Sequence, residues 1–217
     1  MQIIQGILFD PVGCLAEFPS EPFNEIAARL FGRKKKPSKS ASRLYWHLLN
    51  LMEDPDHAPA ESDRKVVEAL EIQAVEAASV YEDVIPALSE LKAMNIKLVM
   101  ASSLSNGAVV RFIDKSALNG FFSAVSTRDN AGAVKAAPLR AALEMASLNP
   151  EHAMFLTDTA EGLKVANALG LNSILMMNDP DEAMRLAAHD PSGGIVSLHE
   201  LPDFLRLIAA ENARKQL

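Results

Sequence analysis

Near-continuous apolar runs alternate with amphipathic stretches along most of the chain. Runs of this kind are typical of parallel strands that are covered on both faces, because neither face of such a strand meets water. Four strong runs and two weaker ones therefore predict six strands. The strong runs are residues 3–9, 97–101, 153–156 and 173–177, and the weaker ones are residues 123–126 and 195–197.

The stretches between these runs carry apolar residues at the spacing of a helix face, and they predict helices at residues 86–94, 138–147 and 161–169. Gly170 follows the last of them as a C-cap glycine. Strands that alternate with helices predict an α/β fold, with a doubly wound parallel sheet between two layers of helices. This is a three-layer, Rossmann-like arrangement.

One region interrupts the alternation. Residues 21–80 show helical patterning and no convincing strand, and amphipathic helices are predicted within residues 22–32, 40–54 and 62–79. A helical block that follows the first strand is expected to form a cap over the sheet. The expected domains are a core of residues 1–17 and 82–217 and a helical cap of residues 18–81.

Composition narrows the class of protein. The chain has 217 residues, of which 49% are hydrophobic, so it can bury a sizeable core. A net charge of -7 disfavours nucleic acid as a partner, because phosphate backbones are bound by basic surfaces. A single cysteine excludes an internal disulfide. Neither a signal peptide nor a membrane-spanning run is recognisable, so we expect a cytoplasmic protein; the sequence does not fix its oligomeric state.

Four polar residues follow the predicted strands at their carboxyl ends, where doubly wound sheets bind ligands. They are Asp10, Ser102, Lys135 and Asp158. A carboxylate placed in this way can attack phosphorus and form an aspartyl-phosphate. Asp10 and Asp158 could together hold Mg²⁺, while Ser102 and Lys135 could contact the phosphoryl oxygens. The sequence thus predicts a site for a small phosphorylated or otherwise anionic metabolite.

The segments around these residues resemble the four ordered motifs of the haloacid dehalogenase superfamily. The resemblance lies in ILFDPVGCL (residues 7–15), LVMASS (98–103) and VKAAPLRAALEMASLNPEHAMFLTDTAEGLKVANALG (134–170). It covers residues 4–177, and the helical insert lies in the slot expected for a cap. It implies a Rossmann-like core, an aspartate nucleophile at Asp10 and Mg²⁺. The most similar branch contains small-molecule phosphatases, phosphoglucomutases and 2-haloacid dehalogenases.

The chain departs from the phosphatase pattern at several positions. The branch has a second aspartate, the general acid and base, where this chain has Val12; the Val12 backbone carbonyl remains as an expected metal ligand. A further acid usually precedes the metal-binding aspartate or follows it by four residues, and these positions are Thr157 and Gly162. Mg²⁺ is therefore expected to bind weakly. The usual Lys-Pro of the third motif is Lys135-Ala136.

Several interpretations stay open. The first is a phosphatase with Asp10 as its nucleophile; the alternatives are a dehalogenase-type hydrolase, which needs no second aspartate, and a degenerate protein that binds without turnover. Ser102 and Asp158 could instead be helix N-caps, with Ser103 and Ser105 as rivals of Ser102. Cys14 is expected to be buried beside the site. The basic residues 33–39 could be a solvated loop or an anion contact.

Overall fold

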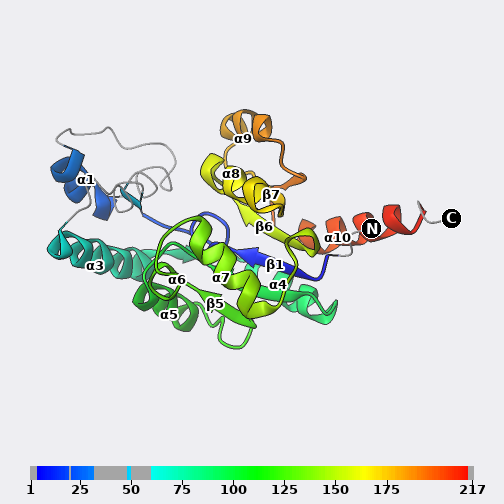
Figure 1. The fold of residues 1–217 in the computed structure, drawn as a ribbon, viewed down its shortest axis with the longest axis horizontal. Coiled ribbons are helices and arrows are strands. Elements are labelled where there is room, and N and C mark those ends of the chain that lie inside the picture. Colours follow the sequence, from blue (N-terminus) through cyan, green and yellow to red (C-terminus); the bar gives the residue numbers. More distant parts are fainter. Residues whose placement is uncertain (1–3, 20, 32–47, 50–59, 215–217) are drawn as a thin grey trace.

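The centre of the structure, a computed structural model that describes residues 4–19, 21–31, 48–49 and 60–214, is a six-stranded parallel sheet (Figure 1). Its strand order is β5-β4-β1-β6-β7-β8, so β1 lies between the two strands that precede Ser102 and Asp158. The strands are β1 (Gly6–Phe9), β4 (Lys97–Ala101), β5 (Ala124–Ser126), β6 (Ala153–Thr157), β7 (Asn172–Met176) and β8 (Gly193–Ile195).

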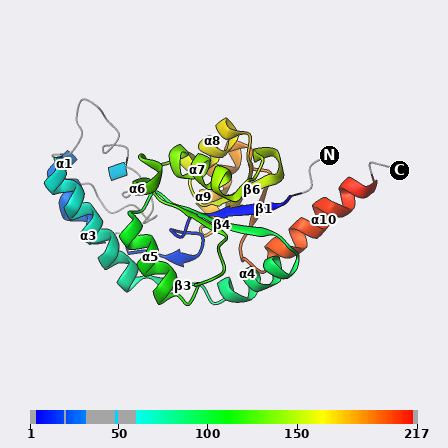
Figure 2. The same cartoon turned by 60° about the horizontal axis from the view of Figure 1, so that its bottom comes forward.

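Both faces of the sheet are covered by helices, as the near-continuous apolar runs predicted. Successive side chains of a strand point to opposite faces. Ile7 and Phe9 of β1 belong to one buried cluster, whereas Leu8 belongs to another. Figure 2 shows α4 (Val84–Ala93), α5 (Asn106–Lys115) and α10 (Glu200–Arg214) on one side of the sheet. On the other side lie α7 (Ala136–Ala146), α8 (Ala160–Leu169) and α9 (Pro180–Leu186).

All six predicted strands are present, and the last one differs most from its predicted bounds. It is β8, which is Gly193–Ile195 rather than residues 195–197. Two glycines begin it, and glycine gives no apolar signal in a sequence. A Cβ atom at Gly193 would lie 2.5 Å from the ring of Phe204, so the close packing of α10 on the strand requires a glycine.

The three helices predicted between the strands are also present, as α4, α7 and α8. The C-cap of α8 is Gly170, which has a φ of 71° in the left-handed region. Short helical turns complete the layers: η1 (Glu21–Phe23), α6 (Arg128–Ala131), η2 (Pro150–His152) and η3 (Ala187–His189). No helix among the described residues is both long and apolar enough to cross a lipid bilayer.

The insert contributes α1 (Asn24–Phe31) and α3 (Glu61–Ala77), which lie beyond the carboxyl edge of the sheet (Figure 1). Of the helix predicted at residues 40–54, only Leu48 and Leu49 are described; both are helical and buried. The basic residues 33–39 lie outside the described residues.

The prediction that residues 21–80 hold no strand was wrong at their end. β3 (Ser79–Val80) pairs antiparallel with β2 (Ala16–Glu17) where the chain leaves and re-enters the core. A strand of two residues is too short to produce an alternating pattern, which explains why the sequence did not reveal it.

Candidate active site

Three of the four predicted site residues follow adjacent strands of the sheet. In the parallel register, Phe9 of β1 is paired with Met100 of β4 and with Leu156 of β6. Asp10 directly follows β1, and Ser102 and Asp158 directly follow β4 and β6. The strand order therefore places the three side chains at one edge of the sheet.

Asp10 and Ser102 are in direct contact. The Ser102 hydroxyl donates a hydrogen bond to Oδ1 of Asp10 at 3.2 Å, and the backbone N–H of Val12 donates to the same oxygen at 3.3 Å. The Leu104 backbone N–H donates to Ser102 Oγ at 3.2 Å. Ser102 is buried, so its hydroxyl is held in one place by the backbone that follows it.

The protonation of Asp10 is tuned by its surroundings. Burial raises the pKa of the Asp10 carboxyl from 3.8 to about 7, although the hydrogen bonds from Val12 and Ser102 act in the opposite direction. The carboxyl therefore keeps its proton to a much higher pH than an ordinary aspartate does. A bound cation would favour the ionised form, which is the form that can act as a nucleophile or a metal ligand.

The turn after β1 passes close to the carboxylate of Asp158. A Cβ atom at Gly13 would lie 2.0 Å from Oδ2 of Asp158, and Gly13 has a φ of 76°. Only glycine satisfies both the close approach and this backbone angle. The side-chain amide of Asn178, which follows β7, donates to the Gly13 carbonyl at 2.7 Å and holds the turn from the other side.

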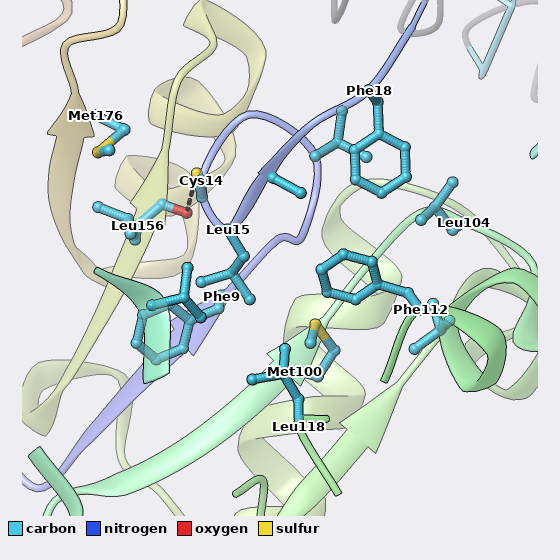
Figure 3. Packing of buried hydrophobic residues seen from close by; sticks show 14 of the residues in the cluster. Phe9, Cys14, Leu15, Phe18, Met100, Leu104, Phe112, Leu118, Leu156 and Met176 are labelled. Carbon is cyan, nitrogen blue, oxygen red and sulfur yellow. Dashed lines mark hydrogen bonds between the residues drawn. The ribbon is translucent and has the colours of Figure 1, made fainter. Parts of the chain in front are cut away.

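Cys14 lies on the same turn and is buried, as predicted. Its thiol donates to the Leu156 carbonyl at 3.5 Å, and Figure 3 shows this contact above the packed side chains of the core. Burial raises the pKa of the Cys14 thiol far above its usual value, and the neighbouring carboxylates of Asp158 and Asp10 add to this. A thiol in this state is no nucleophile.

Lys135 lies on a loop rather than at a strand end. Its backbone adopts a φ of 59° and a ψ of -100°, which is unusual for a residue with a side chain. The Lys135 N–H donates to the Ser103 hydroxyl at 2.8 Å. Strained backbone of this kind costs roughly 1–3 kcal/mol and is typical of functional sites.

Thr157 and Gly162, which occupy the positions where the family usually has a further acid, belong to a hydrogen-bonded network around Thr159. Thr157 Oγ1 lies 3.3 Å from Thr159 Oγ1, and Thr159 Oγ1 accepts from the Gly162 N–H at 3.0 Å. A Cβ atom at Gly162 would lie 2.0 Å from Thr157 Oγ1, so a side chain there would collide with Thr157. Among the described residues, no group of three or more His, Cys, Asp or Glu side chains could hold a metal ion.

The remaining donors are still suited to a hard cation. Two carboxylates, from Asp10 and Asp158, and the backbone carbonyl of Val12 are oxygen ligands of the kind that Mg²⁺ prefers, and Mg²⁺ commonly keeps several waters. The chemistry of this donor set fits Mg²⁺.

The alternative that Ser102 and Asp158 are helix caps is not supported. The side chain that accepts from the first turn of α5 is Ser105, and the one that accepts from the first turn of α8 is Thr159. These residues satisfy the helix ends, which leaves a different role for their neighbours.

Two charged residues that the sequence did not single out lie near the site. Glu71 and Arg128 are buried next to the loop that carries Ser102 and Ser103. A cavity of about 770 Å³ lies between α3 and residues 128–134. Its lining includes the charged side chains of Glu61, Arg64, Lys65, Glu68, Arg128 and Asp129. The one feature of the sequence that could have indicated Arg128 as a residue near the site is its position just beyond the carboxyl end of β5.

Comparisons with known proteins agree with this architecture. A family model described as haloacid dehalogenase-like hydrolase matches residues 23–176. A phosphatase of this type from Thermococcus onnurineus is 20% identical, with a TM-score of 0.66 over 93% of this chain and 98% of that chain. CbbY from Rhodobacter sphaeroides, solved with phosphate, is 21% identical, with a TM-score of 0.68 over 91% and 96% of the respective chains.

A haloacid dehalogenase-like family hydrolase from Streptococcus pneumoniae is 17% identical, with a TM-score of 0.69 over 94% of this chain and 99% of that chain. Likeness at these identities establishes the fold. No match to a curated protein was found.

Proposed function

The chain belongs to the haloacid dehalogenase-like hydrolases, and we propose that it is a phosphatase that acts on a small phosphorylated metabolite. The contact between Asp10 and Ser102 at the carboxyl edge of the sheet carries this proposal, since it pairs a nucleophile with a hydroxyl donor. Similar structures include a phosphatase and a protein solved with phosphate, which supports the same class of substrate.

In this proposal Asp10 attacks the phosphorus atom, and the bond between phosphorus and the leaving-group oxygen breaks. The product is an aspartyl-phosphate, which water then hydrolyses to release inorganic phosphate and restore Asp10. The Ser102 hydroxyl and the Lys135 ammonium group would contact the phosphoryl oxygens and stabilise the negative charge in the transition state. Mg²⁺, when held by Asp10, Asp158 and the Val12 carbonyl, would reduce the repulsion between the carboxylate and the phosphoryl group.

The insert of residues 18–81 would act as a cap on a core of residues 1–17 and 82–217. The β2–β3 pair lies at the two chain crossings between these parts, and α1 and α3 lie at the edge of the sheet where the site is (Figure 1). The cavity of about 770 Å³ beside α3 is lined by none of the four proposed site residues, so it would take the part of the substrate that is distant from the phosphoryl group. Because its lining is highly charged, a polar metabolite suits it better than an apolar one.

A substrate panel tests the proposal. The panel contains phosphorylated metabolites, an aryl phosphate and 2-halo acids, each assayed with and without Mg²⁺, with Asp10→Asn as the blank. We expect phosphate release that depends on Mg²⁺ and Asp10, fastest from the aryl phosphate because its leaving group needs no proton. Halide release without phosphate release would instead favour the dehalogenase alternative, to which Val12 is no obstacle. Release of neither product would favour a binding protein.

Magnesium affinity gives a separate prediction. Only two carboxylates face the proposed ion, so calorimetry should give a dissociation constant above the low micromolar range. Thr157→Asp adds a charged oxygen ligand beside Asp158 and should tighten binding roughly ten-fold. Thr157→Asn is the matched control, because it has the same shape without the charge. Equal affinities of the two variants would contradict the proposed position of the ion.

Magnesium binding should also depend on pH. The pKa of Asp10 is about 7, and its proton must leave before the carboxylate can bind a cation. Affinity should therefore fall as the pH is lowered through 7.

A further inference from the structure

A buried ion pair joins the insert to the core. Glu71, on α3, is 0% exposed, and Arg128, at the start of α6, is 9% exposed. The Arg128 guanidinium donates to Oε1 of Glu71 through Nη1. These two residues are 57 positions apart in the sequence, and neither is among the proposed catalytic groups.

Both members of the pair also hold the loop between β4 and α5. The same Nη1 of Arg128 donates to the Ser103 backbone carbonyl at 3.0 Å. Oε2 of Glu71 accepts from the Ser105 backbone N–H at 3.0 Å. The ion pair therefore fixes the backbone on both sides of Leu104.

The fixed loop contacts two of the proposed site residues. The Leu104 N–H donates to Ser102 Oγ, which itself donates to Asp10. The Ser103 hydroxyl accepts from the backbone N–H of Lys135, whose strained conformation needs such support. By holding Ser103 and Leu104 in place, the ion pair also restrains Ser102 and the backbone of Lys135.

Stability alone is a poor explanation for this pair. Removing two charges from water is costly, and replacing a buried ion pair with apolar residues of similar size is often neutral or stabilising. A buried pair that also bonds to two backbone groups of one loop, the Ser103 carbonyl and the Ser105 N–H, is better explained by the geometry that it imposes on the loop.

We infer that Glu71 and Arg128 are positioning residues, which hold the β4–α5 loop so that Ser102 and Lys135 face the phosphoryl group together. The inference rests on the proposed function for the identity of the ligand. The restraint of Leu104 and Lys135 does not depend on any substrate, because it comes from a residue pair that joins α3 to α6.

The test uses the double variant Glu71→Leu with Arg128→Met, which removes both charges and leaves neither unpaired. The first readout is hydrogen exchange of the Leu104 and Lys135 amides in the ligand-free protein, with unfolding by urea measured alongside. We expect both amides to exchange roughly ten-fold faster or more, while global stability stays comparable to that of the natural chain. The second readout is kcat for an aryl phosphate, which should fall roughly ten- to hundred-fold because a transition-state contact is misplaced.

The matched control is the pair Arg111 and Glu76, which joins α5 to α3 and whose side chains are 54% and 45% exposed. The double variant Arg111→Met with Glu76→Gln should leave both readouts unchanged. Wild-type exchange of the Leu104 and Lys135 amides in the Glu71→Leu, Arg128→Met protein would overturn the inference, whatever the activity. A natural chain that hydrolyses no phosphate ester would instead refute the proposed function, and the exchange rates would still decide the inference.

Arg128→Lys provides a second variant in case the double substitution does not fold. It keeps the charge beside Glu71, but an ammonium group on a flexible stem lacks the planar guanidinium that aims Nη1 at both the carboxylate and the Ser103 carbonyl. We expect intermediate exchange rates at the two amides, and unchanged rates would again overturn the inference.

Discussion

The Val12→Asp variant is expected to turn over an alkyl phosphate about 100-fold faster than the natural chain, because a positioned acid and base contributes typically ~10²–10⁴-fold. The Val12 N–H already contacts Oδ1 of Asp10 at 3.3 Å, so residue 12 lies beside the proposed nucleophile. A carboxyl group there could protonate the leaving oxygen and later activate the water. The gain should be smaller for an aryl phosphate, whose leaving group needs no proton.

Val12→Asn is the matched control, since it has the same shape but no proton to transfer. Val12 is 9% exposed and packs in the main core, so a charge there will also lower stability. Urea unfolding and magnesium calorimetry therefore accompany the kinetics. A Val12→Asp protein that folds, binds Mg²⁺ and is as slow as Val12→Asn would rule out a degenerate phosphatase.

Asp10→Asn should abolish phosphate release and, in the absence of metal, stabilise the fold. Turnover is lost because an amide cannot form the aspartyl-phosphate. Stability rises because the natural carboxyl has a folded pKa of about 7, above its value of 3.8 in the unfolded chain. Below about pH 4 the Asp10 carboxyl is neutral in both the folded and the unfolded state, and burial of the neutral acid costs no charge desolvation. As the pH rises through 7 the buried carboxyl must ionise, and the natural protein loses this stability.

The difference in unfolding free energy between Asp10→Asn and the natural protein should thus be near zero at pH 4, increase up to pH 7 and then level off. A shift of three units corresponds to at most about 4 kcal/mol, and we expect about 2 kcal/mol for a carboxyl that is only half-buried. Asp114→Asn, at an exposed position, should change stability by less than ~0.5 kcal/mol throughout. A flat profile for Asp10→Asn in EDTA would contradict the burial of the Asp10 charge.

The sheet was predictable because each strand is buried on both faces and produces a run of apolar residues. The candidate site was predictable for the same reason, since the residues that follow such runs must meet at one edge. Helix α5 was not predicted, because it begins with Asn106-Gly107, a pair typical of turns. A Cβ atom at Gly107 would lie 3.4 Å from Oε1 of Glu68 on the neighbouring helix α3, which is an ordinary contact, so packing gives no reason for a glycine here.

The supporting contacts of the site could not be predicted from local sequence. Glu71 is one of several glutamates on α3 and resembles the exposed ones in its surroundings along the chain. Its partner Arg128 is found only after α3 is packed against the core, because a pairing across 57 residues depends on the tertiary arrangement. Likewise, the sequence identified Thr157 and Gly162 as departures from the family pattern but could not show that they are neighbours. Only the three-dimensional packing shows that a side chain at position 162 would collide with Thr157.

The single thiol of the chain is also a built-in probe of motion. Cys14 is fully buried on the turn between Asp10 and Asp158, and no other cysteine competes with it for a reagent. A thiol-specific dye can therefore react only when this turn separates from β6, and its rate of labelling reports how often that happens. Because the same turn carries the Val12 carbonyl, a cation that bridges the turn to Asp158 would slow labelling, and its binding could be followed without any substrate.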